Sequence, residues 1–225
     1  MAKITKPSIR PLFHGDIVKR ANLLRFIREY VDINNMIPGY YMEFGVLNGE
    51  GMIDAYRQFR GIFSHFYGFD SFEGLPELSS DDQRAANLSP IFHKGNFASM
   101  QYEFVRQAIL SSCRMEAEEL SLIKGFYNES LPAFDKESLK VHGIPNVIYI
   151  DCDLYSSTLD VLRFIDDLIV TGTWILFDDY WFYRGSPHEG EQKAIREWTE
   201  NHARIGLQPY CNFEGWGRAF IAYEK

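Results

Sequence analysis

Two apolar runs of strand length each end in a pair of aspartates, and this arrangement limits the folds that the chain can adopt. The run NVIYI leads into Asp151 and Asp153, and the run WILF leads into Asp178 and Asp179. Both runs are rich in β-branched and aromatic side chains, which is typical of buried strands. If the two strands are neighbours in a parallel sheet, the four carboxylates converge at one edge. Their repulsion must then be offset by protons, cationic side chains or a metal, and hard oxygen ligands suit magnesium or calcium.

An aspartate after a strand also has a simpler explanation, because it can cap the next helix or begin a turn. Asp153 precedes the segment LYSST, which is expected to open a helix. For either aspartate of the first pair alone, the cap is the preferred interpretation. Two pairs on the two most strand-like runs of the chain favour a metal site.

Strand and helix patterns alternate along the chain. Strands are expected over residues 40–46, 65–69, 120–124, 146–150, 174–177, 208–212 and 218–223. Helices are expected near residues 16–33, 51–59, 99–112, 157–169 and 190–202. The alternation predicts an α/β fold with a doubly wound, mostly parallel seven-stranded sheet. This sheet ends in an antiparallel hairpin and binds ligands at its carboxyl edge.

Length, charge and composition exclude several classes of protein. With 225 residues, the chain is expected to form one domain, with an amino-terminal helical segment at 1–39 and a catalytic core at 40–225. A formal net charge of −8 argues against nucleic acid and against an anionic membrane surface as partners. No apolar run approaches the ~18 residues of a membrane span, and no secretory signal is recognisable. Three widely spaced cysteines form neither a disulfide framework nor a zinc motif, so a cytoplasmic location is expected.

The segment from residue 75 to residue 93 does not fit a compact connection. It is polar, contains two prolines and has no clear periodicity. Loops of this length are uncommon in compact domains and are usually functional or disordered. We expect a lid over the site near residues 75–98. The alternative is a segment that is disordered in the absence of a ligand.

The sequence YMEFGVLNGEG predicts a strand, a glycine-rich turn and the start of a helix. The dinucleotide fingerprint GxGxxG would require glycine at Leu47 and Glu50 if it began at Gly45, so binding of a pyrophosphate is disfavoured. Glu43 is unusual within an apolar strand, and its carboxylate suits a ligand that carries an ammonium or sulfonium charge.

Asp70 ends the next expected strand, 25 residues after Gly45. An acid at this place commonly accepts hydrogen bonds from ribose hydroxyls. The alternative is a simple turn residue before Ser71, which is less favoured once Glu43 and the glycine turn are considered. Together these features indicate an adenosine ligand without a pyrophosphate, for which S-adenosylmethionine is the leading candidate.

Five motifs in order give the sequence a specific resemblance. They are EFGVxxG (43–49), GFDSFEGLP (68–76), GFYNESLP (125–132), DxDLYSST (151–158) and FDDY (177–180). This set resembles the macrocin O-methyltransferase family over about residues 21–198. The resemblance implies a class I, magnesium-dependent enzyme of natural-product biosynthesis that methylates sugar hydroxyls, mostly on macrolide and aminocoumarin glycosides.

The resemblance also implies roles for individual residues. Asp151, Asp178 and Asp179 match the magnesium ligands of the family, and Asp153 matches its proposed general base. Asp70 would bind the ribose, and Phe126 would border the adenine together with the residue after it. The full set expected to bind the cofactor is Glu43, Gly45, Gly49, Asp70, Ser71, Phe126, Tyr127 and Asp151.

Several alternatives stay open at this point. His188, in a loop with Arg184 and the aromatic residues 180–183, is a rival general base, although a solvated loop histidine is the preferred interpretation. The loop departs from the family pattern, and this leaves the identity of the acceptor open. The acceptor is expected to be either a glycosylated natural product or a nucleotide- or polysaccharide-linked sugar. A catechol-type O-methyltransferase, a non-catalytic binder of S-adenosylmethionine and a nicotinamide oxidoreductase are the competing functions. A homo-oligomer is compatible with the sequence but not fixed by it.

Overall fold

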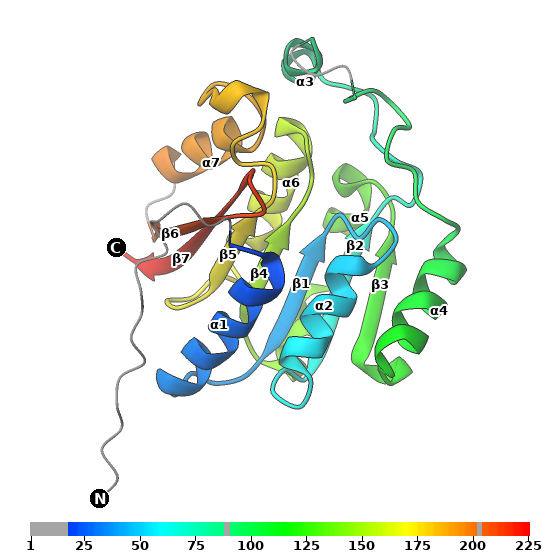
Figure 1. Cartoon of the computed structure of the whole chain (residues 1–225). Coiled ribbons are helices and arrows are strands. Elements are labelled where there is room, and N and C mark those ends of the chain that lie inside the picture. The colour runs from blue at the N-terminus through cyan, green and yellow to red at the C-terminus, as the bar shows by residue number, and fades with distance from the viewer. Residues whose placement is uncertain (1–17, 88–90, 202–203) are drawn as a thin grey trace, which may run out of the picture.

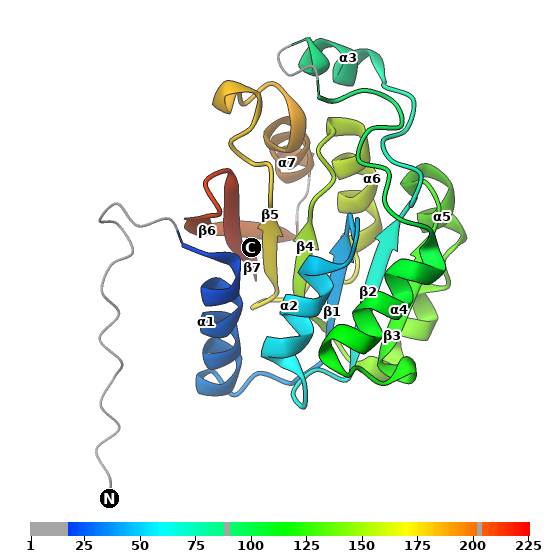
Figure 2. The ribbon, with the colours of Figure 1, turned by 45° about the vertical axis from the view of Figure 1, so that its right-hand side comes forward.

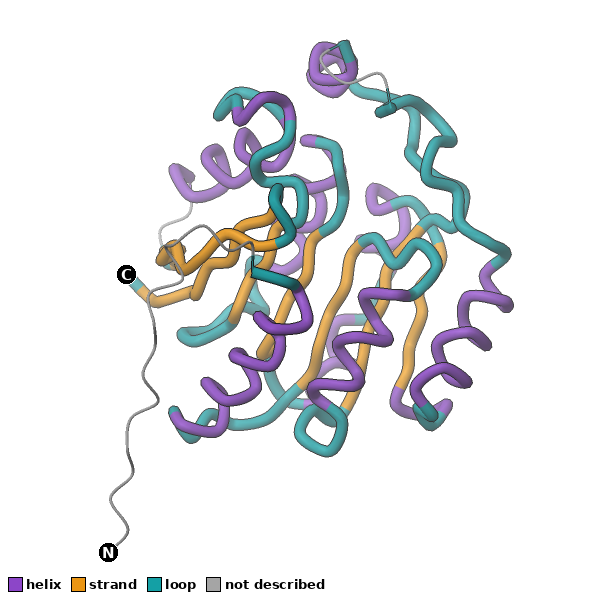
Figure 3. The backbone as a smooth tube through the Cα atoms, in the orientation of Figure 1, coloured by secondary structure: helices purple, strands orange, loops and turns teal. Residues whose placement is uncertain are grey.

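The computed structural model describes residues 18–87, 91–201 and 204–225 of the chain. Its centre is one seven-stranded sheet with the order β3-β2-β1-β4-β5-β7-β6 (Figures 1 and 3). The strands are β1 (Tyr40–Phe44), β2 (His65–Asp70), β3 (Leu120–Lys124), β4 (Pro145–Ile150), β5 (Trp174–Phe177), β6 (Ile205–Phe213) and β7 (Gly217–Glu224). The first five pair in parallel, whereas β7 is antiparallel to both β5 and β6. The expected sheet, with its terminal antiparallel hairpin, is therefore confirmed.

Helices cover both faces of the sheet. They are α1 (Arg20–Ile33), α2 (Glu50–Phe59), α3 (Ser80–Ala86), α4 (Tyr102–Cys113), α5 (Tyr127–Ala133), α6 (Tyr155–Ile165) and α7 (Gly190–Asn201). Helices α1, α2 and α4 lie on one face, and α5, α6 and α7 lie on the other (Figures 1 and 2). Each layer buries its own apolar cluster against the sheet, with Leu24 and Met52 in one cluster and Val161 and Ile195 in the other. These two layers explain why the central strands are apolar on both faces.

Most element boundaries lie within a few residues of those expected, and two short α-helices were missed. Larger differences occur in β6, which begins three residues before the expected 208, and in α6, which ends four residues before the expected 169. Helix α3 lies inside the segment expected to have no periodicity. Ser79 begins it by exchanging hydrogen bonds with Asp82, whose amide donates to Ser79 Oγ at 3.1 Å and whose carboxylate accepts from the same hydroxyl at 2.5 Å. Helix α5, only seven residues long and containing Pro132, was also not expected. A helix of seven residues has only about two turns, which is too short for a periodic pattern of apolar residues to be recognised in the sequence.

The residues around the start of α1 contact β6, the edge strand of the sheet. The expected start of this helix at 16–17 and the expected end of the 190–202 helix at 202 lie outside the described residues. Val18 pairs with Phe213 of β6, and the amide of Arg20 donates to Glu214 Oε1 at 2.5 Å. In the described part of the chain, no helix is both long enough and apolar enough to cross a membrane.

The carboxyl ends of β1, β2, β4 and β5 meet at one edge of the sheet, and α3 lies beyond this edge (Figures 1 and 2). The segments on either side of α3 pack onto residues that follow the strands. Leu75 and Phe92 form a buried cluster with Leu154 and Tyr183. The described part of the 75–98 segment therefore covers the edge at which ligands are expected.

Candidate active site

A cavity of about 780 Å³ opens at the carboxyl edge, beneath the 75–98 segment. Its size is in the range of small-molecule sites. Nine of the residues singled out from the sequence line it: Gly45, Asp70, Ser71, Phe126, Tyr127, Asp151, Asp153, Asp178 and Asp179. Glu43, Gly49 and His188 are not among its lining residues.

The acidic part of the cavity is built by the hydrogen-bond ladder of the sheet. The amide of Asp151 donates to Phe44 O at 2.8 Å, and the amide of Asp178 donates to Ile150 O at 2.9 Å, so each pair continues the ladder by one residue. Strands β4 and β5 are parallel neighbours, as the sequence argument required. The two aspartate pairs consequently meet at one edge.

Three of the four carboxylates form the tightest group. One oxygen each from Asp151, Asp153 and Asp179 lies within 4.8 Å of the other two. Asp178 lines the same cavity but is not part of this group, because its Oδ1 accepts a hydrogen bond from the hydroxyl of Tyr149 on β4. The assignment of Asp178 rather than Asp153 as a metal ligand stays a prediction.

Burial gives these carboxyl groups unusual proton affinities. It raises the pKa of Asp151 and Asp153 well above the aspartate range, and the neighbouring carboxylates raise both pKa values further. Burial also raises the pKa of Asp179 to about 6, while a hydrogen bond with Asp153 limits the rise. A hydrogen bond between two carboxyl groups needs a shared proton, which offsets their repulsion. A bound divalent cation can offset this repulsion in place of the proton. The donor set, oxygen ligands alone, therefore fits Mg²⁺.

The glycine-rich turn after β1 lies directly against the acidic group. Gly45 has a φ of +93°, and a Cβ at this position would overlap the carbonyl oxygen of Asp151. Asp70 fixes the turn, since its Oδ2 accepts from the amides of Val46 and Leu47 at 2.8 Å each. Its Oδ1 accepts from Phe72 N at 2.6 Å. These bonds use three of the about four acceptor positions of a carboxylate, so Asp70 can hold the turn and still accept from a ligand.

Glu43 and Gly49 lie behind this turn and do not face the cavity. The Glu43 carboxyl is buried, accepts from Tyr41 Oη at 2.7 Å and touches the Cα side of Gly51. Burial raises the pKa of Glu43 to about 8. Gly49, with a φ of +92°, begins α2 and packs against Ile109. Their expected contact with the cofactor stays a prediction.

Sequence reasoning missed a cationic side chain beneath the acidic edge. The guanidinium of Arg20, in the first turn of α1, lies 3.4 Å from Tyr149 Oη and 3.5 Å from Asp54 Oδ2. Tyr149 in turn holds Asp178, so a cation, a hydroxyl and a carboxylate form a chain from α1 to the cavity. No sequence signal could have found this arrangement, because Arg20 is one of three arginines in an amphipathic helix, and nothing local distinguishes it.

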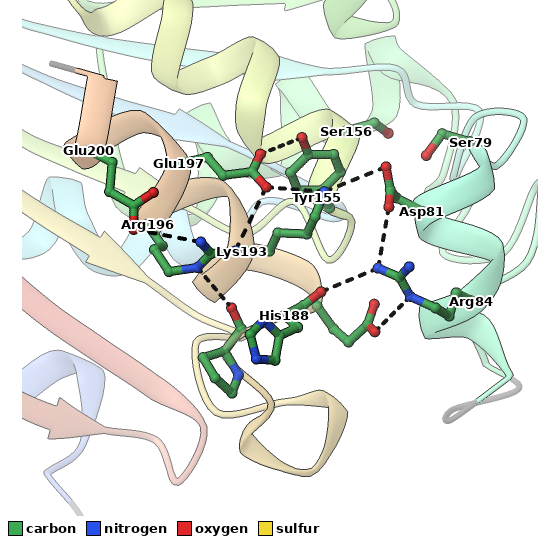
Figure 4. A network of polar contacts seen from close by, with 12 residues as sticks. Ser79, Asp81, Arg84, Tyr155, Ser156, His188, Lys193, Arg196, Glu197 and Glu200 are labelled. Atoms are coloured by element: carbon green, nitrogen blue, oxygen red, sulfur yellow. Dashed lines mark hydrogen bonds and ion pairs between the residues drawn. The ribbon is translucent and has the colours of Figure 1, made fainter.

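Helix α3, within the segment expected to form a lid, is connected by polar contacts to α7 and to the loop before α7 (Figure 4). The amide of Ser156 on α6 also donates to Asp82 Oδ1 of α3 at 3.3 Å. Arg84 of α3 donates to Glu189 Oε1 at 2.9 Å and to the carbonyl of His188 at 3.5 Å. Lys193 of α7 lies 3.5 Å from Asp81 Oδ2. The sequence placed His188 as a rival base, whereas here its backbone contacts the lid.

Comparisons with known proteins agree with this architecture. The profile of the macrocin-O-methyltransferase (TylF) family matches residues 14–205. The demethyldecarbamoylnovobiocin O-methyltransferase of Streptomyces niveus is 26% identical over 170 residues, which cover 72% of this chain and 60% of that protein. The mycinamicin III 3''-O-methyltransferase of Micromonospora griseorubida is 24% identical over 200 residues, covering 82% of this chain and 69% of that protein.

Solved structures show the same fold at low identity. The O-methyltransferase NovP superposes with a TM-score of 0.67 at 22% identity, covering 90% of this chain and 78% of that one. The calicheamicin methyltransferase CalS11 gives a TM-score of 0.64 at 23% identity, covering 91% and 80%. The chain spans only 60% and 64% of the length of the first two curated relatives. Because the family profile covers most of its length, the chain belongs to the macrocin-O-methyltransferase family.

Proposed function

We propose that the protein is an S-adenosylmethionine- and Mg²⁺-dependent O-methyltransferase that acts on a sugar hydroxyl of a small acceptor. The observation that carries this proposal is the grouping of Asp151, Asp153 and Asp179 within 4.8 Å in the cavity that Gly45 and Asp70 also line. The relatives bear the names of O-methyltransferases, and one of these names specifies 4'-O-methylation of a rhamnosyl-bearing tetracenomycin. Their names support the same activity for this chain.

The cofactor would occupy the half of the cavity between the turns after β1, β2 and β3. Asp70 and Ser71 would accept from ribose hydroxyls, while Phe126 and Tyr127 would border the adenine; all four line the cavity. Gly45 would let the methionine part approach the backbone. The cofactor supplies an electrophilic methyl group when bound, and the chain has to place an acceptor oxygen in line with it.

The acidic half of the cavity would orient the acceptor and take its proton. A sugar hydroxyl is a weak acid, and coordination to a divalent cation lowers its pKa. Asp153 is the candidate base, with a carboxylate oxygen as the proton acceptor. Its backbone has a φ of +59°, and its carbonyl accepts from Tyr183 Oη at 3.0 Å. The local structure therefore holds Asp153 in one orientation beside Asp151 and Asp179.

The charge of the cavity favours a neutral acceptor over a nucleotide-linked sugar. Lys94 is the only cation among the described lining residues, and it forms an ion pair with Glu77 at 2.7 Å. A pyrophosphate would meet several carboxylates and no free cationic side chain here. A sugar joined to an uncharged natural product is the better match.

Calorimetric titration with S-adenosylmethionine and with Mg²⁺ tests the proposal. The wild type should bind both, and the double variant Asp151→Asn/Asp179→Asn should lose the Mg²⁺ signal while it keeps cofactor binding. Incubation with a panel of neutral glycosides and thymidine diphosphate sugars, followed by mass spectrometry, should show methylation within the neutral set. Absence of cofactor binding at every Mg²⁺ concentration would refute the proposal.

A further inference from the structure

A fifth carboxylate, Glu191, lies beside the acidic group and has no role in the mechanism above. It stands in the first turn of α7 and is only 1% exposed. Its Oε2 accepts from the backbone amide of Asp179 at 3.1 Å. Its Oε1 is buried without a hydrogen-bond partner among the described residues.

Packing or helix capping does not explain this placement. A buried carboxylate is costly unless it is paired, and Glu191 has no ion pair with a lysine or arginine in the described part of the chain. A leucine or methionine would fill the same space without this cost. Acidic residues do stabilise the first turn of a helix through its dipole, but they do so from exposed positions as well. Neither explanation accounts for the bond to Asp179.

The start of α7 fixes both aspartates that share a hydrogen bond in the acidic group. Gly190 has a φ of +52°, and a Cβ there would overlap the ring of Tyr183. This close approach seats Tyr183, whose hydroxyl donates to the carbonyl of Asp153. The next residue, Glu191, holds the amide of Asp179. Two consecutive residues thus set the backbone of Asp153 through Tyr183 and the backbone of Asp179 directly.

We propose that Glu191 is a positioning residue of the acidic centre, which holds the turn of Asp178 and Asp179 so that the Asp179 carboxylate faces Asp151 and Asp153. The bond is made by an acceptor oxygen, so its function depends on that oxygen rather than on the charge. The consequence for metal affinity rests on the proposed function, whereas the restraint on the turn does not.

Three variants separate the hydrogen bond from charge and packing. Glu191→Gln keeps an oxygen that can accept from Asp179 N and removes the charge. Glu191→Met keeps the approximate volume and removes the acceptor. Glu200→Met, at an exposed position in the last turn of α7, is the matched control. All three should bind S-adenosylmethionine with the affinity of the wild type.

Titration with Mg²⁺ is the first readout. Loss of a group that orients a metal ligand typically weakens binding by about 10- to 100-fold, and we expect this loss for Glu191→Met. The Mg²⁺ affinity of Glu191→Gln should stay within about threefold of the wild-type affinity, which is a smaller loss than removal of the orienting bond would cause. Equal weakening in both variants would show that Glu191 acts through its charge, and wild-type affinity in both would show that it does not position the centre. Either result overturns the proposal.

Hydrogen exchange of the Asp179 amide in metal-free protein is the second readout. The amide should exchange at least about tenfold faster in Glu191→Met than in the wild type, and Glu191→Gln should restore protection. If the wild type binds no Mg²⁺, the metal-dependent part of the proposed function fails, and this exchange comparison alone decides the role of Glu191. Equal protection in the wild type and in Glu191→Met would overturn that role.

Discussion

At the scale of single residues, the acidic edge is a set of carboxyl groups whose surroundings give them different tasks. Asp70 accepts three backbone amides and organises the turn after β1. Asp178 is held by Tyr149, and Asp153 shares a hydrogen bond with Asp179. Residues of one chemical type can thus serve structure, metal binding and proton transfer in one cavity, because each has a different partner.

Asp153→Asn should abolish turnover and preserve cofactor binding. General-base catalysis contributes about 10²- to 10⁴-fold to rate, and an amide cannot accept the proton of the acceptor hydroxyl. Steady-state kinetics and titration with S-adenosylmethionine measure the two effects. Asp160→Asn is the matched control, since Asp160 lines the cavity but forms an ion pair with Arg163. Turnover within a few-fold of the wild type would remove Asp153 as the base.

Glu43 should make the protein less stable as the pH rises. Its folded-state pKa of about 8 exceeds the ordinary value of 4.5, so the folded state binds this proton more tightly than the unfolded state. The free energy of unfolding should therefore fall between about pH 4.5 and pH 8, by an amount on the order of a few kcal/mol.

Denaturant unfolding at pH 5 and at pH 8 measures this fall. Glu43→Gln, which is neutral at both pH values, should show a smaller fall than the wild type. Glu50→Gln, at an exposed position at the start of α2, should behave like the wild type. An identical pH dependence in Glu43→Gln and the wild type would contradict the assignment.

Tyr149→Phe should destabilise the fold through Asp178. The substitution removes the hydroxyl that donates to the part-buried carboxylate of Asp178, and loss of a hydrogen bond to such a group costs on the order of 1 kcal/mol. Chemical denaturation measures the loss. Tyr67→Phe on β2 serves as the control for removal of a tyrosine hydroxyl from the sheet. If the free energy of unfolding falls no more than in the control variant, the hydrogen bond to Asp178 contributes little to stability.

At the scale of elements, the 75–98 segment is held to the rest of the fold by both charged and apolar contacts. Leu75 and Phe92 pack onto Leu154 and Tyr183, and Ala86 of α3 packs against the same cluster.

Helix α3 is also held by ion pairs of Arg84 with Glu189 and of Asp81 with Lys193, and by the buried Asp82 carboxylate, which accepts from Ser156 N at 3.3 Å. Each of these ion pairs joins an exposed or part-exposed side chain to a more buried one, since Glu189 is 10% and Lys193 13% exposed. Ion pairs near the surface contribute on the order of 1 kcal/mol or less, so we expect them to affect local opening of α3 more than global stability.

Arg84→Met should accelerate hydrogen exchange in residues 80–86 and leave global stability nearly unchanged. The variant removes the bonds to Glu189 and to the carbonyl of His188. Arg25→Met, which breaks an exposed ion pair with Glu29 on α1, is the control and should leave exchange in the lid unaltered. Unchanged exchange of α3 in Arg84→Met would mean that the apolar contacts alone hold the lid.

The agreement between expected and observed elements does not follow their length. Strands β3 and β5 have the expected bounds, and in β5 an uninterrupted apolar run leaves little freedom in placing the strand. Strand β6, expected at 208–212, has a mixed pattern and spans Ile205–Phe213. Helices α3 and α5 have seven residues each, and their formation depends on a local cap or on packing rather than on periodicity. The lid role of the 75–98 segment stays a prediction, and the helix within it was not expected.

At the scale of the whole molecule, divalent metal and stability should be linked. The cavity gathers buried carboxylates whose repulsion opposes folding, and a ligand that binds only the folded state stabilises it by mass action. At a Mg²⁺ concentration 100-fold above its dissociation constant, the gain is about 2.7 kcal/mol. Thermal unfolding with Mg²⁺ and with a chelator should show this difference for the wild type. Asp151→Asn should show little of it, and an equal gain in that variant would place the metal elsewhere.

The sequence by itself determined the order of strands and helices, the position of the four aspartates at strand ends and the family. These features depend on local periodicity and on motifs that are contiguous in the chain. Only the tertiary structure decided which side chains meet. It grouped Asp153 with Asp151 and Asp179, bound Asp178 to Tyr149, buried Glu43 behind the turn and brought Arg20 and Glu191 to the site. The physical reason is that these contacts join residues far apart in sequence, and packing fixes their distances.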